Sequence, residues 1–77
     1  MRYGTRVSSS PEQIFDMAKV FFADIGMKVT DEASLRLCLE KEDGFITMQF
    51  RGENEDELDI ITEGYDQRVK TFMKRLR

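Results

Sequence analysis

The sequence predicts an α+β domain in which two helices cover one face of a four-stranded, mainly antiparallel sheet, in the order β-α-β-β-β-α. Three observations lead to this prediction. Several segments alternate apolar and polar residues with a period of two, as half-buried strands do. Two amphipathic segments have helical spacing, and the first has a strong start signal. The 77 residues allow one domain, residues 1–77.

The first strand is expected over Met1–Val7, where apolar and polar residues alternate. A helix follows: Ser10 can cap the free amides, Pro11 suits the first turn, and Gln13 completes a capping box. This helix is expected to run to about Gly26, a residue that favours helix ends. Its apolar positions share one side: Ile14, Phe15, Met17, Ala18, Phe21, Phe22 and Ile25.

Three further strands are expected from the alternation pattern. The second is Lys28–Glu40, with a kink or bulge at Asp31–Glu32. A hairpin turn with Asp43–Gly44 as its central residues leads to the third strand, Phe45–Arg51. After a polar loop, the fourth strand is Glu57–Glu63. These three strands should form a meander.

Gly64 ends the sheet, and the last helix is expected from about Tyr65 or Asp66 to Leu76. We expect the first strand to lie beside the fourth. The predicted core combines the inward positions of all these elements: Tyr3, Val7, Ile14, Ala18, Phe22, Ile25, Leu35, Leu37, Leu39, Ile46, Met48, Phe50, Leu58, Ile60, Val69, Phe72 and Leu76.

The composition limits the classes of protein to which this chain can belong. Charged residues make up 35% of the chain and hydrophobic residues 40%, which is a globular balance. No apolar run reaches the length of a membrane span and no secretory signal follows Met1, so we expect a cytoplasmic protein. The single cysteine excludes an internal disulfide, and histidine, the commonest general base, is absent.

No catalytic or metal site is recognisable in the sequence. Cys38 lies in mid-strand without a histidine, so we interpret it as structural. The carboxylates cluster in loops, where nothing raises their pKa, and no calcium-binding pattern is present. We therefore expect a protein that is not an enzyme and has no cofactor.

The end of the chain is basic, although the net charge is −3. A possible anion-binding set comprises Arg68, Lys70, Lys74, Arg75 and Arg77. One interpretation is a solvated helix end whose cations complement the helix dipole. The other is a nucleic-acid or anionic-surface binder. Nucleic acid is the weaker expectation, because the domain is acidic overall and lacks the stacked aromatics of RNA-binding sheets.

The sheet face that the helices leave uncovered is the second candidate surface. By the period-two register, it carries a possible interaction face made of Arg36, Cys38, Gln49, Arg51 and Ile61. Arginines there can pair with Asp59 or Glu63 across strands, which leaves Cys38 and Ile61 as an apolar centre. The main hypothesis is a small non-catalytic interaction module that binds a protein partner or associates with itself.

The segment Arg6–Phe15 resembles the start of the helix-grip (START/Bet v 1-like) proteins, in which a strand, a small-residue turn and Pro-Glu lead into the first helix. The segment Glu63–Leu76 is similar to their final helix. The resemblance implies an α+β fold and an alternative function, binding of a small hydrophobic ligand between helix and sheet. This chain has fewer strands than the family. We expect that space to be filled by side chains: Leu37, Met48, Phe50, Phe72 and Met73.

Overall fold

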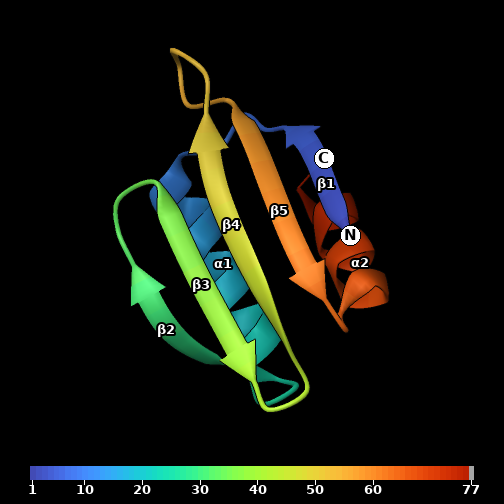
Figure 1. Cartoon of the computed structure of the whole chain (residues 1–77). Helices are drawn as coiled ribbons and strands as arrows, with labels where there is room; N and C mark the ends of the chain where they lie inside the picture. Colours follow the sequence, from blue (N-terminus) through green and yellow to red (C-terminus); the bar gives the residue numbers. More distant parts are fainter. Residues whose placement is uncertain (77) are drawn as a thin grey trace.

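A computed structural model describes residues 1–76, and Arg77 lies outside the described residues. The elements in chain order are β1 (Arg2–Arg6), α1 (Pro11–Ala23), β2 (Lys28–Glu32), β3 (Arg36–Lys41), β4 (Gly44–Arg51), β5 (Glu57–Glu63) and α2 (Asp66–Arg75). The five strands form one antiparallel sheet in the order β1-β5-β4-β3-β2. Both helices lie behind the sheet in Figure 1, so the fold has two layers.

The α+β class is confirmed, but the predicted number of strands is wrong: the sheet has five strands and not four. The predicted strand Lys28–Glu40 is a hairpin, in which β2 turns back through residues 33–35 and pairs with β3. Every residue of β2 is exposed, so its side chains give no alternating pattern. A bulge between Val29 and Asp31 interrupts the pairing, and bulges and polar side chains are typical of edge strands.

The two helices begin close to the predicted positions. Ser10 and Gln13 form the capping box of α1, with their side chains and backbone amides bonded reciprocally. The helix ends at Ala23 and not at Gly26, which instead adopts a φ of 85° in the following turn. The first strand, β1, lies beside β5, as expected from the sequence.

The turn between β3 and β4 differs by one residue from the prediction. Lys41 pairs with Gly44, so the central residues are Glu42 and Asp43. Gly44 does not have a positive φ, so its conformation does not require glycine. The surroundings of Gly44 do require glycine, because a Cβ atom there would lie 2.1 Å from the carbonyl oxygen of Glu63. The glycine therefore allows β5 to pass close to the start of β4.

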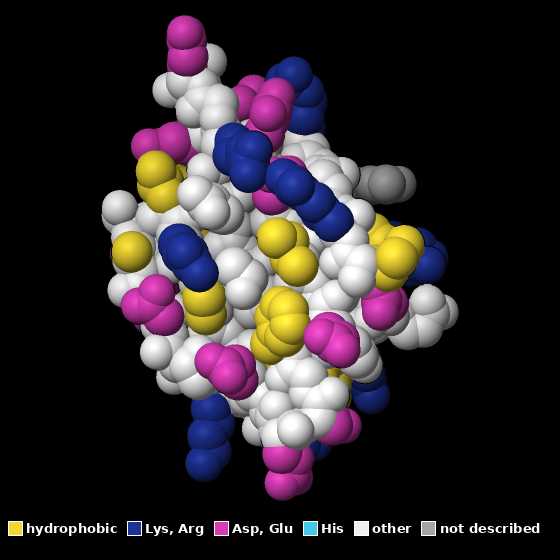
Figure 2. Space-filling view, in the orientation of Figure 1, with side chains coloured by type: hydrophobic (Ala, Val, Ile, Leu, Met, Phe, Trp, Pro, Cys, Tyr) yellow, Lys and Arg dark blue, Asp and Glu magenta, His cyan; other side chains and the backbone are white. Residues whose placement is uncertain are grey.

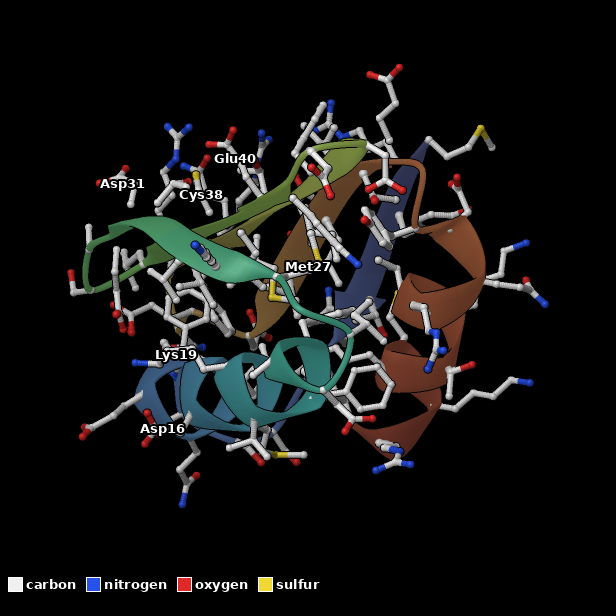
Figure 3. The ribbon with its side chains drawn as sticks, turned by 90° about the horizontal axis from the view of Figure 1, so that it is seen from below. Asp16, Lys19, Met27, Asp31, Cys38 and Glu40 are labelled. Atoms are coloured by element: carbon white, nitrogen blue, oxygen red, sulfur yellow. The ribbon has the colours of Figure 1, made fainter. Side chains whose placement is uncertain are left out.

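The core lies between the sheet and the two helices. Its centre comprises side chains with no exposed area: Ile14, Ala18, Phe22, Leu37, Ile46, Met48, Leu58, Ile60 and Val69. Two buried hydrophobic residues, Phe15 and Met27, were not among the predicted core residues. Met27 follows α1 and points between the layers in Figure 3. Four predicted core residues are only half-buried at the periphery: Tyr3, Ile25, Leu35 and Leu76.

Thr62 is the only buried polar residue among the described residues. The period-two pattern of the sequence places it inward, but the pattern does not indicate why a hydroxyl is tolerated there. Its hydroxyl donates a hydrogen bond of 2.9 Å to the carbonyl oxygen of Phe45. A buried hydroxyl with a partner avoids the desolvation cost of an unsatisfied one.

Candidate functional site

The side of the sheet away from the helices, called the open face below, carries all five residues of the predicted interaction face. Their positions follow from the antiparallel register, in which Arg36 pairs with Gln49, and Cys38 pairs with Thr47, which pairs with Ile61. Figure 3 shows Cys38 pointing away from the helices. In Figure 2 this face has hydrophobic side chains in its middle, with charged side chains around them.

The middle of the open face is partly apolar. Cys38, Thr47 and Ile61 form one row across three strands, and the Thr47 hydroxyl lies 3.7 Å from the Cys38 sulfur. Ile61 is 42% exposed, although most side chains of its size lie in the core. Phe45 is half-buried in the next row towards the start of β4. We call Cys38, Phe45 and Ile61 the apolar centre.

One end of the open face carries several arginine side chains. Asp59 forms ion pairs with both Arg2, at 3.0 Å, and Arg51, at 2.7 Å. Arg36 lies in the same row as Asp59, and within the described chain it has no ion-pair partner. The neighbouring Cys38 side chain and the carboxylate of Asp31 raise the pKa of Arg36 above its usual value. Two arginines thus share one carboxylate, and Arg36 lies in the same row beyond Gln49. We call Arg2, Arg36 and Arg51 the basic end.

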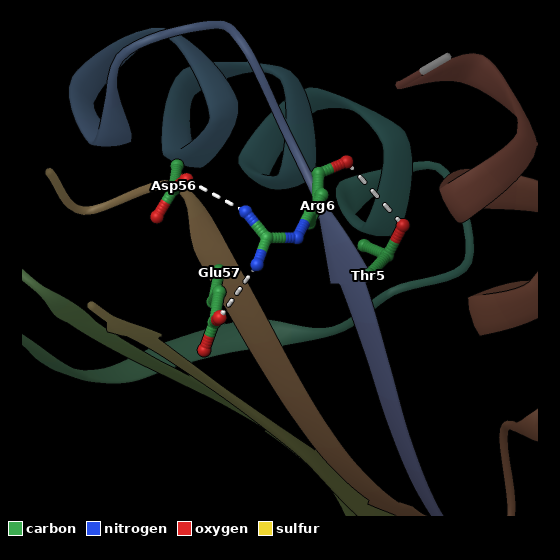
Figure 4. Close-up of polar contacts among 4 residues, drawn as sticks. All are labelled: Thr5, Arg6, Asp56 and Glu57. Atoms are coloured by element: carbon green, nitrogen blue, oxygen red, sulfur yellow. Dashed lines mark hydrogen bonds and ion pairs between the residues drawn. The ribbon is translucent and has the colours of Figure 1, made fainter.

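Arg6 lies beside the basic end, but its charge is neutralised by two neighbouring carboxylates. Its guanidinium group contacts Asp56 at 3.1 Å and Glu57 at 3.3 Å, as Figure 4 shows. Both pairs are solvent-exposed, so each contributes at most about 1 kcal/mol to stability. Arg6 therefore adds no unpaired charge to the surface.

The opposite end of the open face is acidic. Glu63, Phe45 and Glu40 form one row across β5, β4 and β3. Neither glutamate has an ion-pair partner within the described residues, and Lys28 on the edge strand faces Glu40 without reaching it. We call Glu40 and Glu63 the acidic end. In Figure 2, acidic side chains lie below the hydrophobic middle of this face, and both basic and acidic side chains lie above it.

The basic residues of α2 do not gather on one surface. Arg68 and Arg75 are two helical turns apart and border a groove between α1 and α2. Lys70 and Lys74 lie on another side of the helix, and the Lys70 ammonium group sits 5.8 Å from the Tyr3 ring centre. Arg77, the fifth member of the predicted anion-binding set, lies outside the described residues.

The residues expected to fill the space between helices and sheet are inside the core or at its border. Leu37, Met48, Phe50 and Phe72 are buried, and Met73 is half-buried. A shallow groove of about 440 Å³ lies instead on the outer side of the helix layer. Its lining comprises Asp16, Met17, Val20, Phe21, Phe72 and Arg75.

Two kinds of feature are absent from residues 1–76. No group of three or more histidine, cysteine, aspartate or glutamate residues there is arranged to hold a metal ion. None of the helices in that range has both the length and the apolar character needed to cross a membrane.

The sequence did not reveal the separation of charge on the open face. Arg2, Glu40 and Glu63 were not among the predicted site residues, because their grouping depends on which strands are neighbours and on their register. The only signal in the sequence was their outward phase in the period-two pattern.

The chain was also compared with known proteins. No protein-family model, no curated protein and no solved structure matches it.

Proposed function

We propose that this protein is a non-catalytic interaction module that associates with itself through the open face of its sheet. The observation that carries the proposal is the apolar centre. Ile61 is 42% exposed in mid-strand, beside the half-buried Cys38 and Phe45, while the other large apolar residues of β3, β4 and β5 point into the core. An apolar centre inside a polar rim is the usual anatomy of a protein–protein interface.

A solvent-exposed face is stable in antiparallel sheets, so exposure alone does not indicate a partner. The proposal depends on the composition of this face. The charges around the apolar centre include the arginines of the basic end, and arginine is enriched at interfaces because its planar group packs while remaining charged. Asp59 holds Arg2 and Arg51 in place, which reduces the side-chain entropy lost on binding.

Substitution of Ile61 by lysine tests the proposal. We expect the wild-type chain to associate reversibly as its concentration rises in sedimentation velocity, and Ile61→Lys to remain monomeric with nearly the same thermal midpoint. Val20→Lys is the matched control, because Val20 is 76% exposed on the helix layer, and it should associate like the wild type.

A wild-type chain that stays monomeric throughout the accessible concentration range contradicts the proposal. So does an Ile61→Lys variant that associates as well as the wild type. If Ile61→Lys is unfolded by circular dichroism, Ile61→Ser replaces it, with the same expected loss of association.

A further inference from the structure

We infer that the groove between α1 and α2 binds an amphipathic helix of a partner protein, with the apolar stripe of that helix in the groove and an acidic flank against α2. The groove lies on the outer side of the helix layer, which is the opposite side of the molecule from the open face. It is therefore a second interaction surface, separate from the one proposed for self-association.

The outer side of α1 exposes two large apolar side chains to solvent. Val20 is 76% exposed and Met17 is 41% exposed, and residues three apart lie on the same face of a helix. Beside them, Phe21 and Phe72 line the floor of the groove, with their ring centres 5.4 Å apart. The solvent-facing side of a surface helix is normally polar, so these adjoining apolar side chains indicate a partner that covers them.

The two helices run antiparallel along the groove. One hollow is bordered by Met17 and Arg75, and a second is bordered by Asp24 and Arg68, so the end of α1 lies beside the start of α2. Both hollows share Val20 in their lining and together form one groove. The seven residues from Arg68 to Arg75 span about 10 Å of helix, or two turns. A bound helix can place apolar side chains in such a groove at successive turns.

The α2 side of the groove is basic. Arg68 and Arg75 both line it, and within residues 1–76 neither arginine has an ion-pair partner. The guanidinium carbon of Arg75 lies 4.9 Å from the centre of the Phe21 ring, a contact that holds this group at the edge of the groove. A guanidinium group stacked on a ring keeps N–H donors at its edge, where a carboxylate can accept them.

The α1 side of the groove has a different charge. It carries Asp16 and Asp24, and the ammonium group of Lys19 lies 3.6 Å from the Asp16 carboxylate. In Figure 3, Asp16 lies on the side of α1 away from the sheet. A flat anionic surface such as a membrane would meet these carboxylates together with the arginines. A helix can instead place acidic residues on its α2 flank and neutral residues on its α1 flank, so charge complementarity favours a helix with one acidic flank.

Synthetic helical peptides test the inference. The probe peptide has two heptads, with leucine at the a and d positions, glutamate at the e positions on one flank and glutamine at the g positions on the other. A side-chain crosslink on its polar side keeps this short peptide helical. Its two glutamates are seven residues apart, like Arg68 and Arg75. We expect the probe to bind the wild-type chain with micromolar affinity in isothermal titration calorimetry. A peptide with glutamine at both e positions should bind about tenfold more weakly.

Variants of the chain locate the binding. Val20→Lys should abolish it, because a charge enters the apolar groove, while the thermal midpoint stays close to that of the wild type. Arg68→Glu/Arg75→Glu should weaken binding of the probe at least about tenfold and should instead bind a peptide with lysine at the e positions. Lys70→Glu/Lys74→Glu is the matched control, because it makes the same change in charge on another side of α2. It should bind the probe like the wild type.

The inference is overturned if the probe does not bind the wild type, if Val20→Lys binds it equally well, or if the glutamate and glutamine peptides bind with equal affinity. It is also overturned if vesicles of phosphatidylserine and phosphatidylcholine retain the wild type but not Val20→Lys, because the groove then faces a membrane.

Ile61→Lys separates this inference from the proposed function. This variant should bind the probe like the wild type, although it is expected not to associate with itself. A wild-type chain that is monomeric at every concentration and binds the probe overturns the proposed function alone. A wild-type chain that associates with itself and does not bind the probe overturns only the helix-binding groove.

Discussion

The hydroxyl of Tyr65 donates a hydrogen bond to the carboxylate of Asp43, and this bond ties the start of α2 to the turn between β3 and β4. The bond lowers the pKa of Asp43 and, together with partial burial and the nearby negative charges, raises the pKa of Tyr65 to about 12. The same place contains Gly44, whose missing Cβ lets Glu63 and Tyr65 approach. A helix start, a strand end and a hairpin turn are thus held together at one corner.

The Tyr65–Asp43 bond predicts a pH-dependent stability. Asp43 has a lowered pKa in the folded state, so its contribution is present at neutral pH and is lost as the pH falls through that folded pKa. Tyr65 has a raised pKa, so its contribution is complete below its ordinary pKa of 10.0 and is lost as the pH rises towards about 12. Tyr65→Phe should lower the thermal midpoint at neutral pH. The difference in midpoint between the variant and the wild type should shrink both as the pH falls through the pKa of Asp43 and as it rises towards that of Tyr65. A gap that is constant from acid to alkaline pH contradicts this prediction.

Gly44→Ala should be strongly destabilising. The added Cβ would lie 2.1 Å from the carbonyl oxygen of Glu63 and 2.9 Å from the Tyr65 ring, so the backbone must move. We expect a loss well above the ~1 kcal/mol of an average substitution, measured by urea denaturation. Gly4→Ala is the matched control in a strand, because its nearest neighbour would lie at an ordinary 3.5 Å. Equal effects at the two glycines would show that close approach is not what requires Gly44.

Phe72→Ala tests whether α2 is integral to the fold. Phe72 is 1% exposed, and its ring centre lies 5.4 Å from those of both Phe21 and Phe22. Removal of a buried phenylalanine ring costs about 3–5 kcal/mol, which is comparable with the whole stability of a small domain. The variant should be largely unfolded at body temperature by circular dichroism. Met73→Ala, at a half-buried neighbour, should be much milder. A native spectrum and an unchanged midpoint for Phe72→Ala would mean that the α2 packing is wrong.

Ser10→Ala should cost about 1 kcal/mol, because it removes the acceptor for the Gln13 amide at the start of α1. Ser9→Ala, one residue earlier and exposed, should be nearly neutral in the same thermal denaturation series. Ser10→Asp should retain most of the stability, since aspartate is also a good cap. A loss at Ser9 as large as that at Ser10 would show that the turn as a whole, and not the cap, is responsible.

Local signals in the sequence were sufficient to predict most of the elements. The cap at Ser10, the alternation in β4 and β5 and the helical spacing after Tyr65 each depend on residues close in sequence. The hairpin between β2 and β3 could not be predicted in this way. All five side chains of β2 are exposed, so backbone pairing and the ion pair between Glu32 and Lys19 hold it at the edge. Neither contact produces a hydrophobic pattern in the sequence.

In the candidate site too, local signals in the sequence predict some features, and other features depend on contacts between distant segments. The outward phase of Cys38 and Ile61 follows from alternation within single strands. The grouping of residues at the basic end does not follow from this alternation, because Arg2 reaches Asp59 from a strand 57 residues away in the chain. The grouping of charge on the open face thus required the strand order, which depends on contacts between distant segments.

The strand order also has a consequence for how the chain folds. The hairpins from β2 to β5 join neighbours in sequence, so they can form early and locally. Within residues 1–76, β1 pairs with no strand other than β5, and Arg6 and Glu57 are 51 residues apart in the chain. Because closing such a long loop is slow, we expect β1 to dock last and to leave the backbone edge of β5 transiently open to intermolecular pairing during refolding. Refolding yield should therefore fall as protein concentration rises, even where the native chain shows no tendency to aggregate.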